Sequence, residues 1–174
     1  PPARPTPATR TFLLAGVTPQ YTRAGHRTAE TFRSATDTLM LVQTDVGARR
    51  VRTLSLPRDT FVSLPGRGGA KLNSALPTLG PDGLVRAVEG LTGLHVDGYV
   101  LINLGGVRDL TDAVGGVTVD VDRAMDYDDF AGDLHIHLRA GRQRLDGARA
   151  EQYLRFRHDR RGDLGRIERQ QGYL

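Results

Sequence analysis

The feature that most constrains the fold is the alternation, along the chain, of short apolar strands with segments of helical spacing. Residues 11–17 and 98–104 are apolar runs of the length that a buried strand needs. Residues 82–94 instead carry leucine and valine at intervals of three and four, and Gly93 is expected to end that helix. Strands that alternate with helices predict a three-layer α/β domain, in which helices flank a central sheet.

A hairpin within this pattern makes the expected sheet mixed. Residues 37–44 and 50–56 have strand-type composition on both sides of the turn residues 45–48. Further helices are expected over residues 71–79, 107–114, 146–153 and 163–171, and half-exposed strands over residues 117–121 and 134–138.

The composition fits one globular domain preceded by a stiff segment. The chain has 174 residues, of which 39% are hydrophobic, and this is enough for one domain with its own core. Residues 1–10 are rich in proline and resemble a linker, so we expect the domain to occupy residues 11–174. The polar stretch 18–35 is expected to be a long loop, which in a compact domain is usually functional or mobile.

Charge and cysteine content narrow the function classes. A net charge of +4 and a pI of about 9.9 favour anionic partners. The absence of cysteine excludes disulfides, thiolate-ligated zinc and thiol nucleophiles. Nucleic acid is disfavoured as the partner, because the C-terminal arginines are interleaved with acids and only 6% of residues are aromatic.

The densest cluster of candidate ligand-binding side chains lies near the C-terminal end. Arg155 and Arg157 alternate with apolar residues, so in an extended segment both would project to one face. Asp163, Arg166 and Gln170 are spaced by three and four, which on a helix places them on one side. Several arginines near one acid suit a phosphorylated anion, because each guanidinium can bind two phosphate oxygens. A solvated basic helix is the alternative interpretation of this segment.

A second group of charged residues lies where strands are expected to begin and end. Arg58 and Asp59 directly follow an expected strand, and strand ends are where ligand crevices form in α/β sheets. Asp37 begins another strand, and a carboxylate near several arginines is a plausible Mg²⁺ ligand. A surface ion pair and a strand-capping acid are the simpler alternatives.

Two other patterns carry less weight. His135 and His137 lie on one face of an expected strand, which formally suits a metal. No third histidine is near, and Asp133 is the one carboxylate at a matching spacing, so an exposed strand face is preferred. The acids within residues 126–129 lack the glycine and terminal glutamate of a calcium loop and are interpreted as a turn.

An ordered set of motifs resembles the LytR-CpsA-Psr family, and the match runs from about residue 12 to the C-terminus. The motifs are Thr36-Asp-Thr-Leu-Met-Leu41, Ser55-Leu-Pro-Arg-Asp-Thr60, Lys71-Leu-Asn-Ser-Ala75, Asp112-Ala-Val-Gly-Gly-Val117, Leu145-Asp-Gly147 and Arg155-Phe-Arg157 followed by Asp163-Leu-Gly-Arg166 and Arg169-Gln-Gln171.

The resemblance implies a phosphotransferase that moves a glycopolymer from a polyprenyl-pyrophosphate carrier onto peptidoglycan with the help of Mg²⁺. It also implies a bacterial membrane protein whose catalytic domain lies outside the cytoplasm, with an N-terminal anchor missing from this chain. The carrier lipid would occupy an apolar pocket, for which the apolar faces of residues 82–94 and 107–114 are candidates, although core packing explains those faces equally well.

The same resemblance implies roles for individual residues. The catalytic residues would be Arg58, Asp37, Arg157 and Asp163, with Asp37 holding the metal and Asp163 orienting arginines. The pyrophosphate would be bound by Arg58, Lys71, Asn73, Arg155, Arg157, Arg166 and Gln170. The acceptor of the hydroxyl proton stays open between Asp37 and Asp59.

Two departures from the family pattern concern the metal. Thr18 stands where the family typically has a first Asp, and Ala35 stands where it usually has an Arg. Threonine coordinates Mg²⁺ less strongly than a carboxylate, so we expect weaker metal binding or reduced activity. A module that binds polyprenyl phosphate or wall glycan without turnover is therefore the alternative function.

Overall fold

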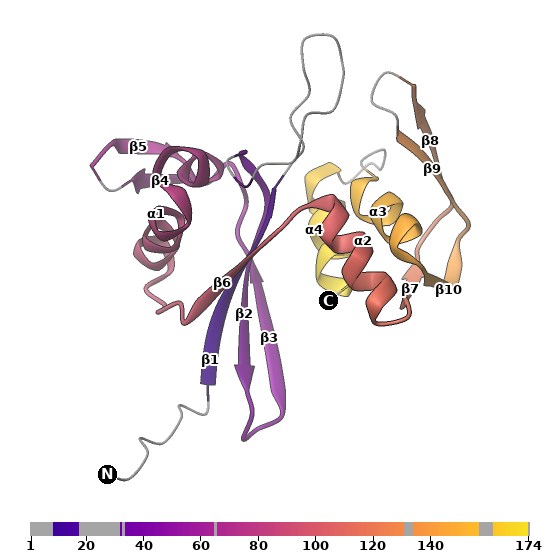
Figure 1. Cartoon of the computed structure of the whole chain (residues 1–174), viewed down its shortest axis with the longest axis horizontal. Coiled ribbons are helices and arrows are strands. Elements are labelled where there is room, and N and C mark those ends of the chain that lie inside the picture. Colours follow the sequence, from indigo (N-terminus) through magenta and orange to yellow (C-terminus); the bar gives the residue numbers. More distant parts are fainter. Residues whose placement is uncertain are drawn as a thin grey trace. The chain divides into compact units, whose positions relative to one another are not determined.

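The computed structural model describes residues 9–17, 32, 34–64, 66–130, 134–156 and 162–173, without the side chains of residues 162–164 and 166. The described chain forms two compact units (Figure 1). The first unit contains the described residues up to Ile102, and the second unit contains those from Asn103 onward.

The first unit is built on a mixed four-stranded sheet with the strand order β3-β2-β1-β6. Strand β2 pairs antiparallel with both β1 and β3, whereas β6 pairs parallel with β1, which confirms the expected mixed sheet. Its elements are β1 (Thr9–Val17), β2 (Thr36–Asp45), β3 (Arg50–Ser55), β4 (Phe61–Leu64), β5 (Gly68–Lys71), the 3₁₀ turn η1 (Leu72–Ser74), α1 (Ala75–Thr92) and β6 (Gly98–Ile102).

The core of the first unit lies between one face of this sheet and α1. Alternate residues of β1 point inward, as the period of two in a strand requires. The main core side chains are Leu13, Ala15 and Val17 of β1, Leu39 and Leu41 of β2, and Leu76, Leu84, Ala87 and Val88 of α1. This burial explains why the apolar positions of 82–94 follow helical spacing.

Helix α1 is kinked where the sequence predicts a boundary between two helices. Gly80 has φ 72° and ψ −175°, a conformation that favours glycine, and Pro81 follows it as the first residue of the next helical segment. Gly93 ends the helix with φ 69° and donates its N–H to the carbonyl of Glu89 at 2.8 Å. The expected helix end at Gly93 is confirmed.

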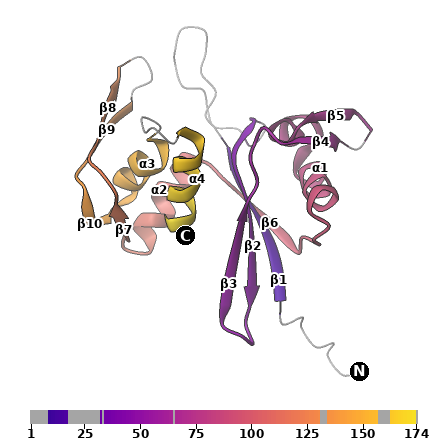
Figure 2. The same cartoon turned by 180° about the vertical axis from the view of Figure 1, so that it is seen from behind.

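The second unit combines three helices with one long, interrupted β-hairpin (Figure 2). Strand β7 pairs with β10 and, further along, β8 pairs with β9, both antiparallel. The elements are α2 (Leu104–Ala113), β7 (Val117–Val121), β8 (Met125–Asp129), β9 (Leu134–Leu138), β10 (Gly141–Leu145), α3 (Gly147–Arg155) and α4 (Gly162–Tyr173).

The turn expected for the acids of residues 126–129 is wrong, because these residues belong to β8. Met125 is buried while Asp126 and Asp128 are exposed, so the segment alternates as a half-exposed strand does. The high acid content conceals this pattern, since aspartate is depleted in strands. Strands β4, β5 and β10 were likewise not expected; β4 has only four residues, β5 is rich in glycine and β10 contains two arginines.

Helices α2 and α3 are held together by residues of two sequence motifs. The main-chain N–H of Gly147 donates to Oδ1 of Asp112 at 2.8 Å. Asp146 is the N-cap of α3, and its Oδ1 accepts from the N–H of Arg149 at 2.9 Å. The hydroxyl groups of Tyr173 and Thr111 are hydrogen-bonded, which joins α4 to α2.

None of the helices in the described residues is long and apolar enough to cross a membrane. The α/β class and the central mixed sheet with helices are confirmed. The three-layer arrangement and the apolar lipid pocket stay predictions, as does the division into a linker over residues 1–10 and a domain over residues 11–174.

Replacement of Gly147 by alanine should destabilise the protein by about 1–3 kcal/mol, the usual cost of forcing atoms into a filled space. A Cβ at this position would lie 2.7 Å from Oδ2 of Asp112 and 2.8 Å from Cα of Arg108. Chemical denaturation of the wild-type chain and of Gly147→Ala measures this loss of stability. Gly90→Ala is the matched control, because a Cβ there has nothing within 4 Å on an exposed helix face, and equal effects of both changes would contradict the close contact of α2 and α3.

Candidate functional site

The register of the β2–β3 hairpin brings Arg58 to Asp37. Met40 lies opposite Ser55, and the N–H of Leu56 donates to the carbonyl of Leu39 at 2.8 Å. If this register is continued past the end of β3, Arg58 falls opposite Asp37. Nη1 of Arg58 donates to Oδ1 of Asp37, and the two side chains are 28% and 24% exposed. Sequence reasoning selected both residues without pairing them, although the hairpin register contains the signal.

Asp59 and Lys71 extend this pair into a cluster of alternating charges. Nζ of Lys71 lies 2.8 Å from Oδ1 of Asp59, and Nε of Arg58 lies 3.7 Å from Oδ2 of Asp59. We call Asp37, Arg58, Asp59 and Lys71 the strand-end cluster. The pKa of the Asp59 carboxyl is lowered from its ordinary value, chiefly by the hydrogen bond with Lys71 and also by the positive charges of Lys71 and Arg58.

Main-chain hydrogen bonds explain why two separate motifs meet at this cluster. The N–H of Leu72 donates to the carbonyl of Thr60 at 2.8 Å, and the N–H of Asn73 donates to the carbonyl of Arg58 at 3.0 Å. These bonds dock η1 on the turn after β3 and carry Lys71 to Asp59. Asn73 thus contacts Arg58 through its backbone, whereas its expected role in binding pyrophosphate stays a prediction.

In the second unit, Arg155 is paired with an acid that sequence reasoning missed. Nη1 of Arg155 donates to Oε1 of Glu151 at 3.1 Å, one helical turn away. Oε2 of Glu151 lies 3.6 Å from Nη1 of Arg108, and the Glu151 side chain is only 12% exposed. The spacing of four residues between Glu151 and Arg155 could have revealed this pair.

The extended segment predicted around Arg155 and Arg157 is wrong at Arg155. Tyr153, Leu154 and Arg155 form the last turn of α3, so the alternation that would place both arginines on one face does not apply. These three residues are helical because they continue α3, which Asp146 caps and which buries one side through Ala150 and Tyr153. Arg157 itself lies outside the described residues.

Arg169 has a structural position that the motif alone did not indicate. It is 7% exposed, its Nη2 donates to the carbonyl of Phe156 at 2.6 Å, and its guanidinium carbon lies 5.6 Å from the centre of the Phe156 ring. An arginine buried in this way fixes the chain directly after α3. It is therefore one basic residue of the C-terminal segment that supports the fold.

The remaining predicted residues divide between the helix α4 and the undescribed part of the chain. The helix predicted over 163–171 is confirmed, and Gln170 is half-buried on it. The side chains of Asp163 and Arg166 lie outside the described structure, as does Thr18. Their expected roles stay predictions.

The described donors around Asp37 suit a metal only weakly. Asp37 is not a member of any group of three or more His, Asp or Glu ligand atoms that the described residues offer. Its carboxylate is also hydrogen-bonded to a guanidinium. Mg²⁺ is commonly held by one or two carboxylates together with substrate phosphates and water, so Asp37 fits such an ion when phosphate oxygens complete the site.

The chain is similar in sequence to proteins whose names refer to the cell wall. It is 42% identical over 121 residues to the probable cell wall biosynthesis protein LcpB of Corynebacterium glutamicum. It is 38% identical over 141 residues to the polyisoprenyl-teichoic acid–peptidoglycan teichoic acid transferase TagU of Oceanobacillus iheyensis. These matches cover 70% and 77% of this chain, which spans 28% and 42% of the lengths of the two relatives.

A solved structure supports the same relationship. The LytR-CPS2A-psr family protein YwtF (TagT) with bound octaprenyl pyrophosphate lipid superposes with a TM-score of 0.72 at 25% identity. The similarity covers 99% of this chain and 66% of that protein. The sequence model of the LytR_cpsA_psr family matches residues 6–174. The chain therefore belongs to the LytR_cpsA_psr family.

Proposed function

We propose that the protein is a phosphotransferase that moves a glycopolymer from a polyprenyl-pyrophosphate carrier onto peptidoglycan. The observation that carries the proposal is the pairing of Arg58 with Asp37 at the strand ends, in a family with a relative named as a teichoic acid transferase and a member that binds octaprenyl pyrophosphate. The glycan-linked carrier and peptidoglycan are the proposed partners.

The reaction requires charge stabilisation more than covalent participation of the protein. A sugar hydroxyl attacks the phosphorus that bears the glycan, a new P–O bond forms, and the bond to the polyprenyl phosphate breaks. The hydroxyl proton passes to a base, and the polyprenyl phosphate leaves with the negative charge. Positioned cations that stabilise the developing charge on the phosphate oxygens accelerate such a transfer.

Arg58 is suited to this role because its orientation is fixed before the substrate arrives. Asp37 accepts from one guanidinium nitrogen, and about a quarter of the side chain remains exposed for an incoming anion. A guanidinium held by a carboxylate loses little conformational freedom on binding. In the second unit, Arg155 is held comparably by Glu151, which we propose as its positioning residue.

Both candidate proton acceptors are paired with basic side chains. Lys71 lowers the pKa of Asp59, so Asp59 is a weak base at neutral pH. Asp37 is paired with Arg58 and is also the residue that would hold Mg²⁺ together with phosphate oxygens, so the choice between the two acids stays open. When bound at Asp37, Mg²⁺ would neutralise pyrophosphate charge.

The substrates also determine where the protein would work. Peptidoglycan lies outside the bacterial cytoplasm, and a polyprenyl carrier resides in the membrane. We therefore propose that the domain works, anchored to the membrane, at the outer face of the cell membrane.

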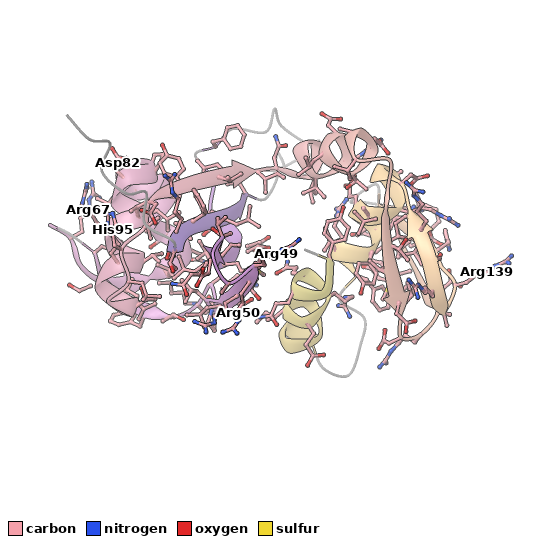
Figure 3. All side chains as sticks on the ribbon, turned by 90° about the horizontal axis from the view of Figure 1, so that it is seen from below. Arg49, Arg50, Arg67, Asp82, His95 and Arg139 are labelled. Carbon is pink, nitrogen blue, oxygen red and sulfur yellow. The ribbon has the colours of Figure 1, made fainter. Side chains whose placement is uncertain are left out.

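Replacement of Arg58 by alanine should weaken binding of a short-chain prenyl diphosphate at least tenfold, because hydrogen bonds to charged groups contribute about 1.5–3 kcal/mol. Calorimetric titration of the purified chain measures this. Arg67→Ala is the matched control, since Arg67 is exposed on the β4–β5 turn of the same unit (Figure 3).

A turnover assay that follows the release of polyprenyl phosphate should show a parallel loss with Arg58→Ala. Unchanged binding in this variant would mean that the arginine is surface charge. Binding that is lost in the variant, together with no turnover in the wild-type chain, would favour the binding module without catalysis.

Replacement of Lys71 by methionine should raise the pKa of Asp59 toward its ordinary value, since the hydrogen bond to Lys71 is the largest cause of its lowering. Carboxyl carbon chemical shifts followed by NMR against pH measure this pKa directly. Because the pKa of Asp59 is lower in the folded chain than in the unfolded chain, the ionised carboxylate stabilises the fold at pH values above the unfolded-state pKa. This stabilisation is lost as the pH falls through the folded-state pKa. Acid should therefore destabilise the wild-type chain more than Lys71→Met, and an Asp59 pKa unchanged in the variant would contradict the ion pair.

Mg²⁺ should strengthen the binding of the prenyl diphosphate, and Asp37→Asn should abolish this increment. Without the diphosphate, Mg²⁺ binding should be weak, because one carboxylate paired with a guanidinium offers little net negative charge. Calorimetry with and without the ligand measures both quantities, and Asp59→Asn serves as the control. Tight Mg²⁺ binding that survives Asp37→Asn would overturn the assignment of Asp37.

A further inference from the structure

The β8–β9 hairpin of the second unit gathers two histidines and two aspartates on one face. Asp128 lies directly opposite His135, and Asp126 lies directly opposite His137. The alternate residues Met125 and Ile136 point into the core, so these four side chains all stand on the solvent face.

The polar atoms of this group lie within the reach of one small ion. Nδ1 of His135 lies 2.5 Å from Oδ1 of Asp128, and Nε2 of His137 lies 3.2 Å from the same oxygen. One ligand atom from each of Asp128, His135 and His137 can be chosen so that all three lie within 4.8 Å of one another. A tetrahedral zinc site with bonds of about 2.0–2.2 Å has ligand atoms about 3.3–3.6 Å apart, so only small side-chain rotations separate this arrangement from a coordination shell.

The two histidines lie on an exposed strand face, as expected, and the structure adds the carboxylates that lie opposite them. The described carboxylates come from the opposite strand, and Asp133 lies outside the described residues. A sequence-only analysis could not supply them, because residues 126–129 were not expected to form a strand.

We propose that Asp128, His135 and His137 form a binding site for a divalent transition-metal ion of the Zn²⁺ type. Two imidazoles and one carboxylate are the ligand set that zinc accepts, with the fourth position open to water or to a further ligand. Mg²⁺ and Ca²⁺ prefer oxygen ligands and are not expected to compete. The site is separate in the chain from the strand-end cluster, so it goes beyond the proposed transferase activity.

Asp126 completes the site as a positioning residue for His137. Its Oδ1 lies 2.5 Å from Nδ1 of His137, so the Nδ1–H can donate to it and Nε2 is left to face Asp128. A carboxylate in this position fixes the tautomer and increases the basicity of a metal-binding imidazole. The ring of Phe130 contacts His135 edge-on, with ring centres 5.3 Å apart, and restricts the second imidazole.

Two exposed aspartates place negative charge directly beside the two imidazoles of the hairpin. A proton competes for the same imidazoles, so metal binding should weaken as the solution becomes more acidic.

The test is a titration of the whole chain, purified without a histidine tag, with ZnCl₂ in excess Mg²⁺ at neutral pH. Calorimetry should show one saturable site, and amide NMR shifts should concentrate in residues 125–138. His135→Gln and His137→Gln should each weaken binding at least tenfold. Asp126→Asn should weaken it by about 10-fold to 100-fold without removing a ligand.

His95→Gln is the matched control, because His95 is also exposed and also contacts an acid, with its Nδ1 2.9 Å from Oε1 of Glu89. It belongs to the first unit and should leave Zn²⁺ binding unchanged. The absence of saturable binding, NMR shifts located away from the hairpin, or equal effects of the His95 and His137 variants would each overturn the proposal. All of the substituted side chains are exposed, and amide spectra of the variants verify that the hairpin is retained.

Discussion

The antiparallel pairing of β2 with β3 is the constraint on which the strand-end cluster depends. It sets Arg58 against Asp37, although the two residues are separated by most of the hairpin. The turn after β3 then receives the main-chain N–H groups of η1, and this carries Lys71 to Asp59. Backbone hydrogen bonds, rather than side-chain attraction, therefore assemble the cluster, and the charges act within a geometry that the sheet has already determined.

Sequence patterns predicted those parts of the fold in which hydrophobic periodicity is strong. The strands at 11–17 and 117–121 and the helix end at Gly93 agree with the structure, because burial of one face imposes the pattern directly. Strand β8 was missed because its exposed face consists of aspartates that resemble a turn. Charged residues indicate little about backbone conformation, since their side chains can be solvated in a helix, a strand or a turn.

The candidate site was predictable as a set of residues but not as a set of contacts. Motifs identified Arg58, Asp37 and Arg155, yet pairing requires a register or a helix boundary that no single motif contains. Glu151 was overlooked because its partner was assigned to an extended segment, whereas α3 continues to Arg155 and places the two residues one turn apart. Other motif residues, such as Asp112 and Gly147, serve the packing of helices instead.

The short turn at residues 46–49, which links β2 to β3 at the end remote from the cluster, acquires an unexpected importance. Its side chains are exposed, so most of them can change without loss of core packing. The length of the turn cannot change, because gaining or losing one residue would shift the register of the two strands by one residue and move each side chain to the opposite face. Insertion of one residue into this distant turn would therefore disrupt the strand-end cluster as thoroughly as a substitution within it, although no residue of the cluster would be replaced.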